Sequence, residues 1–213
     1  MGEGRDRALV EKLLAGDEGA FSSLVSSHNG ALLRLARSFV PSQAVAEEVV
    51  QETWLEVLKG LSRFEGRSSL KTWIFKILAN RARTRGVREK RSLPFSALAG
   101  DDPEGSDDGS FDPTEFISDG HWAPGHRYWT GENPEIALDQ KRLAAAIRQA
   151  IDELPPNLRS VILLRDVEGW SSEEACEALE LSEANQRVLL HRARARVRKS
   201  LWRLFPTKGA AHG

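Results

Sequence analysis

"SSEEACEALELSEANQRVLLHRARARVRKSLWRLF", at positions 171–205, predicts two helices joined by a tight turn. Ser171 and Glu174 have the spacing of a capping box, which marks the start of the first helix. Ser182 is a suitable N-cap for the second helix, so the turn lies around Glu180. A short helix, a tight turn and a longer basic helix are typical of a helix-turn-helix. In that motif the N-terminal end of the second helix reaches base edges in the major groove of DNA.

The second of these helices carries side chains that suit contact with DNA. Glutamate pairs with cytosine edges, asparagine and glutamine with adenine, and arginine with guanine. Positions 187–208 contain eight Lys or Arg residues and no Asp or Glu, which favours contact with phosphates. The alternative is a solvent-exposed amphipathic helix, held by Leu190, Ala193, Val197 and Leu201. The DNA-contacting residues predicted on this helix are Ser182, Glu183, Asn185, Gln186, Arg187, His191, Arg192 and Arg194.

A second basic block, "RFEGRSSLKTWIFKILANRARTRGVREKR", occupies positions 63–91 and has ten Lys or Arg residues against two Glu. It predicts a loop at 64–69 and a helix from 70 to about 88. On this helix we expect Leu70, Ile74, Ile77 and Leu78 to face inward and Thr72, Lys76, Asn80 and Arg83 to face outward. Cations, aromatic rings and polar side chains together suit unstacked single-stranded bases better than a duplex groove. Alternatively, Trp73 and Phe75 belong to the core, as we expect for at least one of them.

The residues before this block predict three further helices. Positions 5–40 contain two helical segments, interrupted at "AGDEGA", and positions 44–61 form the third. The third helix has an apolar side made of Ala46, Val50, Trp54, Val57 and Leu61. Glu48, Gln51 and Glu52 lie together on its opposite side. Because no His or Cys stands at ligand spacing beside Glu47, Glu48 and Glu52, we expect a polar contact face rather than a metal site.

The two basic blocks are separated by an acidic stretch that contains no helical pattern. Positions 92–126 have eight acidic residues and no Lys or Arg, which predicts a long linker. Aromatic residues are spaced along it: Phe111, Phe116, Trp122, Tyr128 and Trp129. They could dock on the chain's own domains or on a partner, and both alternatives stay open. His121 and His126 are a weak indication of a metal site.

The segments together predict an all-α protein with two small helical domains. Helices return at 134–154 and 155–169, and no segment alternates as a strand would. The expected organisation is a first domain at 1–95, a linker at 96–133, a second domain at 134–206 and a tail at 207–213.

Composition narrows the class of function. The 213 residues include a single cysteine, Cys176, and no apolar stretch near the length of a membrane span, and no signal peptide is evident. We therefore expect a cytoplasmic protein. The sequence has no phosphate-binding glycine loop, no nucleophile–base pair and no paired catalytic acids, so we expect neither enzyme activity nor a cofactor or metal.

Three stretches resemble the conserved regions of bacterial RNA polymerase sigma factors of the sigma-70 family, in the extracytoplasmic-function (ECF) group. "AEEVVQETWLEV", at 46–57, resembles region 2.2, and "FEGRSSLKTWIFKILAN", at 64–80, resembles regions 2.3–2.4. Positions 154–198, from "LPPNLRSVILL" to "HRARARVR", resemble region 4. The resemblance implies a sigma-2 and a sigma-4 domain that bind core polymerase, recognise the −10 and −35 promoter elements, melt the −10 region and direct initiation.

The resemblance also implies a role for each residue set. The residues implied to bind the β′ clamp helices of core polymerase are Glu47, Glu48, Gln51, Glu52 and Leu55. Those implied to bind the −10 element are Arg63, Phe64, Gly66, Arg67, Ser68, Ser69, Lys71, Thr72, Trp73, Lys76, Asn80 and Arg83. Arg165 joins the helix-turn-helix residues at the −35 element, where the sigma-4 domain also meets the β flap. The resemblance and the long linker further imply an anti-sigma factor that binds between the domains.

Three positions depart from the pattern of the family. Val45 stands where an acidic residue usually begins region 2.2, and the recognition helix reads "EANQRVLLHRAR". Glu180 occupies the turn of the helix-turn-helix, where many relatives have glycine. If that position needs a left-handed backbone, a residue other than glycine costs about 1–2 kcal/mol. A stand-alone helix-turn-helix regulator remains the alternative, although it leaves 44–91 unexplained.

Overall fold

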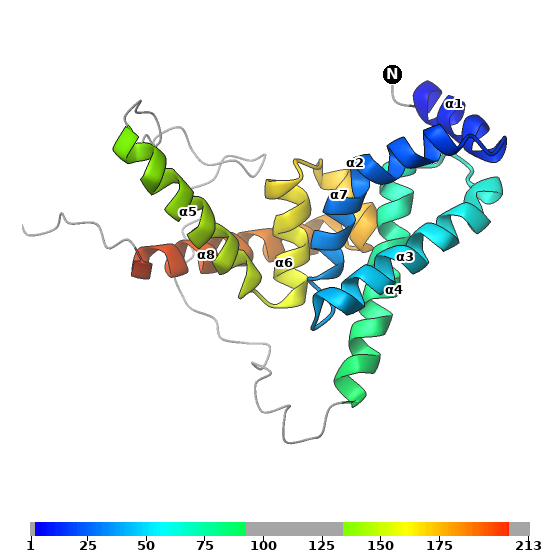
Figure 1. Ribbon diagram of the computed structural model, residues 1–213. Coiled ribbons are helices and arrows are strands. Elements are labelled where there is room, and N and C mark those ends of the chain that lie inside the picture. Colours follow the sequence, from blue (N-terminus) through cyan, green and yellow to red (C-terminus); the bar gives the residue numbers. More distant parts are fainter. Residues whose placement is uncertain (1–2, 93–133, 205–213) are drawn as a thin grey trace, which may run out of the picture.

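The computed structural model describes residues 3–92 and 134–204, and within these ranges the chain forms helices joined by short turns and loops, without strands (Figure 1). The first half contains α1 (Glu3–Leu14), α2 (Glu18–Ala36), α3 (Gln43–Gly60), the short 3-10 helix η1 (Leu61–Arg63) and α4 (Leu70–Ser92). The second half contains α5 (Pro134–Asp152), α6 (Pro156–Ile162), the π-helical turn η4 (Leu163–Val167), α7 (Ser172–Leu179) and α8 (Glu183–Leu204). The predicted linker, with its five aromatic residues and two histidines, lies outside the described residues, as does the tail.

Short-range capping sets the start of several helices. Side-chain oxygens of Asp17, Ser42, Ser171 and Ser182 each accept a hydrogen bond from the backbone N–H three residues later. The Glu174 side chain also accepts from the backbone N–H of Ser171, which completes the predicted capping box. Each of these bonds pairs an N–H that has no partner within the helix. The predicted caps of the helix-turn-helix are thereby confirmed.

The apolar stripes predicted for α3 and α4 form the core of the first half. The stripe of α3, from Ala46 to Leu61, is buried throughout, and Phe75 of α4 is only 1% exposed. Trp73 is half-buried against Phe64, with 5.3 Å between ring centroids. Gly86 lets α4 pass very close to the end of α2, since a Cβ atom there would lie 2.1 Å from the carbonyl oxygen of Phe39. A packed backbone cannot accommodate such an atom without moving.

The helix predicted at 155–169 ends in an unexpected way. After α6 the chain widens into η4, where the N–H of Glu168 donates to the carbonyl of Leu163 at 2.9 Å. The N–H of Trp170 then donates to the carbonyl of Leu164 at 3.0 Å. Pi-helical turns are rare and frequently mark functional positions. Here the turn places Trp170, which is 3% exposed, at the contact between the two halves.

The two halves are in direct contact, which the sequence did not predict. Helix α4 packs against α7, and α2 contacts η4. Figure 1 shows α7 near the centre of the molecule, beside α4 and away from the free end of α5. The buried apolar residues of both halves belong to one contiguous cluster. Long-range packing of this kind leaves no local signal in a sequence.

Candidate polymerase and nucleic-acid interfaces

A cleft of about 690 Å³ lies between α3, α4 and the loop that joins them. Its walls include Phe64 and Gly66 of the loop and Trp73 and Asn80 of α4. Gly66 has a φ of 70°, in the left-handed region that glycine adopts at no steric cost. The cleft therefore combines aromatic rings, an amide side chain and a loop turned by glycine. These are features that suit a single unstacked base.

The residues predicted to contact the −10 element divide into three groups. Those that line the cleft are Arg63, Phe64, Gly66, Arg67, Ser68, Trp73, Lys76 and Asn80. Lys71 and Arg83 instead contact the second half of the chain, through Glu174 and the carbonyl of Leu179. Ser69 and Thr72 form the third group, at the start of α4, where they complete its N-terminal cap.

The prediction that Thr72 faces outward is wrong. Its side chain is 1% exposed, and its hydroxyl lies 2.8 Å from the hydroxyl of Ser69. The Ser69 hydroxyl also accepts from the backbone N–H of Thr72 at 3.0 Å. On a helix, Thr72 falls in one stripe with Phe75, Ala79 and Ala82, all of which are buried. Helix α4 is thus buried on two sides rather than one, and Thr72 closes the cap instead of facing DNA.

Asn80 is half-buried at the wall of the cleft. Its Oδ1 atom accepts a hydrogen bond from Nη1 of Arg83 at 3.2 Å. This bond orients the amide group, because an asparagine side chain can otherwise rotate to present either its donor or its acceptor. The structure therefore orients the Asn80 amide at the wall of the same cleft that Phe64 and Trp73 line.

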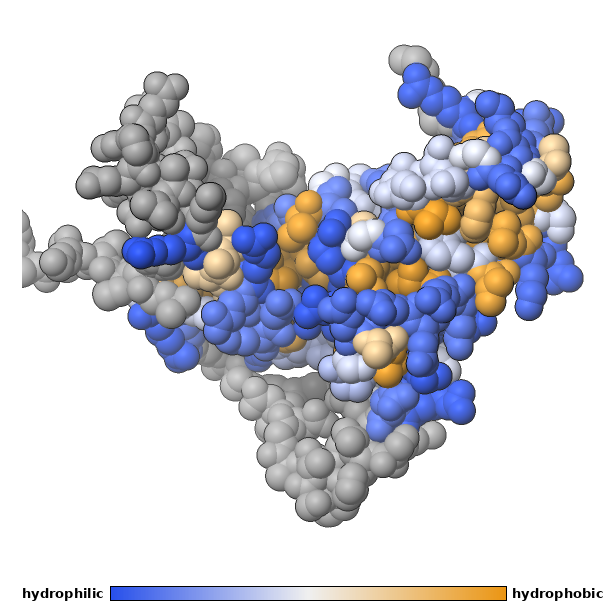
Figure 2. All heavy atoms as spheres, viewed as in Figure 1, coloured by the Kyte–Doolittle hydropathy of each residue, from blue (hydrophilic) through white to orange (hydrophobic). Residues whose placement is uncertain are grey.

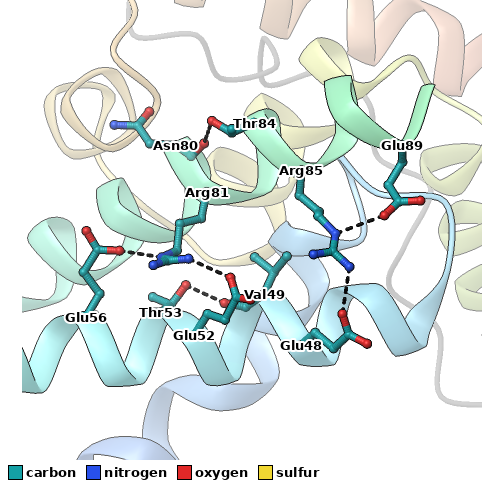
Figure 3. Close-up of polar contacts among 10 residues, drawn as sticks. All are labelled: Glu48, Val49, Glu52, Thr53, Glu56, Asn80, Arg81, Thr84, Arg85 and Glu89. Atoms are coloured by element: carbon teal, nitrogen blue, oxygen red, sulfur yellow. Dashed lines mark hydrogen bonds and ion pairs between the residues drawn. The ribbon is translucent and has the colours of Figure 1, made fainter. Parts of the chain in front are cut away.

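A network of ion pairs joins α3 to α4 (Figure 3). The pairs are Arg81 with Glu52 and Glu56, and Arg85 with Glu48 and Glu89. Neither Arg81 nor Arg85 was predicted from the sequence to contact α3. Their spacing of four residues matches that of the α3 glutamates, so a search for complementary i, i+4 charges on adjacent helices could have found them. The predicted polymerase-binding glutamates Glu48 and Glu52 are therefore already paired within the chain.

The rest of the predicted polymerase-binding face is exposed. Glu47, Gln51 and Leu55 lie on the surface of α3, and Leu55 is 57% exposed. Leu58, about one helical turn after Leu55, is also an exposed large apolar residue. In Figure 2, apolar side chains gather over α2 and α3 beside a strongly hydrophilic band. Exposed apolar side chains rimmed by charged ones are typical of a protein-binding surface.

The turn of the helix-turn-helix has the left-handed backbone that the sequence suggested. Glu180 has φ 55° and ψ 47°, and no other non-glycine among the described residues has a positive φ. The N–H of Leu181 donates to the carbonyl of Cys176 at 2.9 Å, which closes the C-terminal end of α7. The glutamate at this position therefore carries a backbone strain energy that a glycine would not have.

The start of α8 presents part of the predicted base-reading set to solvent. Ser182, Glu183, Asn185, Arg187 and Arg192 are exposed, and His191 is half-buried. Nη2 of Arg187 lies 2.6 Å from the Glu183 carboxylate, in an i, i+4 pair with both side chains more than 60% exposed. An exposed pair of this kind is worth about 0.3–0.5 kcal/mol, so Arg187 can exchange it for a base or a phosphate at little cost.

Gln186 and Arg194 are not on the DNA-facing surface, contrary to the prediction. Gln186 is 1% exposed, and its Oε1 atom accepts from the Ser172 hydroxyl at 3.0 Å. Arg194 is 8% exposed and donates from Nε and Nη2 to the two oxygens of Asp166, at 2.8 and 2.7 Å. Both residues belong to the inward stripe of Leu190, at four residues before and after it. This spacing was present in the sequence and could have excluded them.

Arg165 lies in η4, the turn that Arg194 contacts through Asp166. It is half-buried, and its Nη1 atom donates to the backbone carbonyl of Trp170. In this structure it holds the chain after η4 through one of its five N–H donors, and its contact with the −35 element stays a prediction.

The described residues contain neither a cluster of metal-binding side chains nor a helix that could span a membrane. No group of three or more His, Cys, Asp or Glu side chains in residues 3–92 and 134–204 could hold a metal ion. Within the same ranges, no helix combines the length and the apolar character that crossing a membrane requires.

Comparison with known proteins identifies the family. Residues 24–92 match the family model of Sigma-70 region 2, and residues 144–197 match that of Sigma-70, region 4. The ECF RNA polymerase sigma-E factor of Escherichia coli (strain K12) is 30% identical over 189 residues, which cover 89% of this chain and 90% of that protein. The RNA polymerase sigma-H factor of Pseudomonas aeruginosa is 29% identical over 197 residues, covering 92% and 94%.

Two solved structures share the fold. CnrH in complex with the cytosolic domain of CnrY has a TM-score of 0.55 at 24% identity, over 92% of this chain and 96% of that chain. The sigma factor RpoE of Bartonella quintana, in complex with the anti-sigma factor NepR, has a TM-score of 0.52 at 24% identity, over 85% and 96%. The chain therefore belongs to the sigma-70 family, in the group of the ECF RNA polymerase sigma factors. Its function is to bind RNA polymerase and direct it to promoters.

Proposed function

We propose that this sigma factor uses three separate surfaces, one for each macromolecular contact. The exposed face of α3 binds the clamp of core polymerase, the cleft beside α4 captures a base of the melted −10 strand, and the start of α8 reads the −35 element. In this proposal positions 1–95 and 134–206 act as two binding domains in the cytoplasm, and no residue has a catalytic role.

The cleft is the observation that carries the proposal. Extruding a base from the stack costs a few kcal/mol, which contacts in the pocket must offset. Stacking on an aromatic ring returns about 1–3 kcal/mol per base, and Phe64 and Trp73 provide two rings. Asn80 adds a donor and an acceptor for a base edge, while Arg63 and Lys76 supply charge for the adjoining phosphates.

The exposed face of α3 combines apolar, polar and charged side chains, which supports a contact with polymerase. Leu55 offers apolar area, and Glu47 and Gln51 are exposed beside it. Glu48 and Glu52 would contact a basic partner only by sharing or exchanging their arginines of α4. On α8, Asn185 and Arg187 are the exposed side chains best suited to base edges. A separate anti-sigma factor remains a prediction, motivated by the length of the linker.

The test is transcription in vitro with purified core polymerase and a randomised promoter library. We expect enrichment of paired −35 and −10 sequences that depends on the chain. Asn80→Ala should reduce permanganate reactivity of the −10 region more than it reduces binding to polymerase. Equal loss of both would indicate a folding defect. Selective promoter binding without polymerase would favour a stand-alone regulator instead.

A further inference from the structure

Asp6, in α1, caps the start of α4 although the two positions are 64 residues apart in the sequence. Its Oδ2 atom accepts a hydrogen bond from the backbone N–H of Leu70, the first residue of α4, at 2.8 Å. Asp6 is half-buried, whereas Arg5 and Arg7 on either side of it are exposed. The carboxylate therefore points toward α4 rather than into solvent, and α1 takes part in the N-terminal cap of another helix.

This hydrogen bond pairs a group that has no partner within its own helix. The first N–H groups of a helix lack acceptors in a preceding turn, and the N-cap side chain satisfies only that of the second or third residue. Here the Ser69 hydroxyl accepts from the N–H of Thr72 at 3.0 Å, and the N–H of Leu70 is left to Asp6. Leu70 is 2% exposed, so water has little access to replace the carboxylate. The helix dipole also favours a negative charge at this end of α4.

Helix α1 contacts both ends of the loop at 64–69. The bond to Leu70 lies directly after the loop, and α1 also contacts η1, which directly precedes it. Figure 1 shows α1 at the same end of the molecule as the connection from α3 to α4. Fixing the ends of a loop removes much of the conformational freedom of the residues between them. The loop can therefore keep a defined shape although it is polar and contains Gly66.

The same loop and the first turn of α4 form the aromatic wall of the cleft. Phe64, the first residue of the loop, packs against Trp73, with 5.3 Å between ring centroids. Trp73 follows Leu70 by less than one helical turn, so a shift of Leu70 moves Trp73 with it. On its other side the ring of Trp73 meets the end of α3, since a Cβ atom at Gly60 would lie 3.3 Å from it. The position of this ring depends on where α4 begins.

We propose that Asp6 is a positioning residue for the pocket that captures a base of the −10 strand. The inference rests on the proposed function, which assigns that pocket to the cleft beside α4. Asp6 acts through Leu70: it fixes the first turn of α4 and thereby the place of Trp73 relative to Phe64. A binding site needs its side chains held within about 0.5 Å of the productive geometry. The cap on Leu70 supplies this restraint at the point where the loop joins the helix.

A matched control separates this role from a general effect on stability. Asp17 makes a cap of the same kind at the start of α2, where its Oδ1 atom accepts from the N–H of Ala20 at 2.9 Å. Neither Asp17 nor Ala20 lines the cleft. Asp17→Ala therefore removes one aspartate cap and one negative charge, as Asp6→Ala does, but leaves the pocket unchanged. The two variants should lower the Tm by similar amounts.

The first measurement is hydrogen exchange of the Leu70 amide in the full-length chain, followed by NMR. Asp6→Ala should speed this exchange by about tenfold, because one buried hydrogen bond is lost. Asp6→Asn keeps a side-chain carbonyl oxygen that can accept the bond, so the rate should stay within about twofold of the parent. Asp17→Ala should leave the exchange of the Leu70 amide unchanged.

The second measurement is the base preference in the −10 element, taken from transcription with core polymerase and the randomised promoter library. Asn80→Ala identifies the captured position, because it removes an amide from the wall of the pocket. At that position Asp6→Ala should reduce enrichment of the favoured base about fivefold, equivalent to one net hydrogen bond. Its −35 preference and its affinity for core polymerase should not change. Asp6→Asn should restore most of the −10 preference, and Asp17→Ala should keep it.

Three results would overturn the role of Asp6. Unchanged exchange of the Leu70 amide in Asp6→Ala would show that the cap does not form. Equal loss of the −10 preference in Asp6→Ala and Asp17→Ala would show a general effect of stability. Faster exchange with an intact −10 preference would reduce Asp6 to a structural cap. The proposed function is tested separately by Asn80→Ala: if this variant also keeps the preference at every −10 position, the cleft is not the base pocket, and the role of Asp6 in it fails as well.

Discussion

Replacing Arg194 by alanine is expected to destabilise the second half of the chain, with little direct effect on DNA contacts. Arg194 joins α8 to η4 through two hydrogen-bonded contacts with Asp166, at 2.7 and 2.8 Å. The Arg194 side chain is 9% exposed and that of Asp166 is 32% exposed. Removing one partner of a fully buried pair costs about 3–5 kcal/mol, because the other charge stays buried without compensation.

The partial exposure of Asp166 lowers that cost. Water can solvate its carboxylate once the arginine is gone, so we expect a loss of about 2–3 kcal/mol in the free energy of unfolding. For a chain of this size, each kcal/mol corresponds to about 2–4 °C in Tm. The expected fall for Arg194→Ala is therefore about 4–12 °C, measured by circular dichroism at 222 nm.

Arg192 provides the matched control, since it is exposed and lies two residues away on the same helix. Arg192→Ala should change the free energy of unfolding by less than about 0.5 kcal/mol. It should instead weaken binding to all promoter sequences and reduce the slope of log K against log salt by about 1. A double-mutant cycle with Asp166→Ala isolates the coupling of the Arg194 pair.

The structural role of Arg194 would be contradicted if Arg194→Ala retained the parent Tm and reduced the salt slope as Arg192→Ala does. Arg194 would then contact phosphate, as the sequence first suggested, and its pair with Asp166 would be incidental. A zero coupling energy in the double-mutant cycle would lead to the same conclusion.

Four further outcomes are expected. Reversing the charges of Glu48 and Glu52 to lysine should weaken binding to core polymerase at least tenfold with helicity retained, and unchanged affinity by fluorescence anisotropy would remove α3 from the polymerase contact. Burial lowers the pKa of His28 below 6.5, so the unfolded chain binds its proton first as pH falls. The neutral His28 side chain contributes fully to the stability of the folded chain above pH 6.5, and this contribution is lost as the pH falls below 6.5. His28→Gln should therefore flatten the decline in urea midpoint between pH 7.5 and 5.5. Burial also raises the pKa of the Cys176 thiol, so iodoacetamide should modify it faster in urea than in the native chain; equal rates would mean that the thiol is not protected. Gly86→Ala forces a Cβ atom against the backbone of Phe39, in the turn after α2, and should cost about 1–3 kcal/mol, seen as a lower Tm; an unchanged Tm would mean that this turn moves away from α4 freely.

The sequence alone determined that the chain is helical and where the two helices of the helix-turn-helix begin. Caps depend on contacts three residues apart, so Ser171, Glu174 and Ser182 could be assigned without any knowledge of the tertiary structure. The left-handed backbone of Glu180 was considered only as a condition, because many relatives have glycine at that turn, and the structure shows that the condition holds. The apolar stripe of α3 was also correct, because helical periodicity defines which residues share a face.

Helical periodicity does not show which helix faces pack against distant parts of the chain. Tertiary structure alone decided which predicted surface residues are buried. Thr72 was assigned to the outer surface because one stripe of α4 sufficed for the core, yet α4 is buried on two sides. Gln186 and Arg194 were assigned to DNA by their side-chain type. Their position beside Leu190 places them inward, where Asp166 pairs with Arg194 and the Ser172 hydroxyl donates to Oε1 of Gln186, while Nε2 of Gln186 is buried without a hydrogen-bond partner among the described residues.

The contact between α4 and α7 could only come from the tertiary structure. Its ion pairs join residues that are separated by about a hundred positions, so neither local propensity nor short-range charge spacing contains a signal for them. The basic block at 63–91 was correctly located, but its charge does not choose between a nucleic acid and an acidic helix. That choice depends on shape and distance: α7 presents carboxylates and a helix end within reach of Lys71, Lys76 and Arg83 in the compact chain.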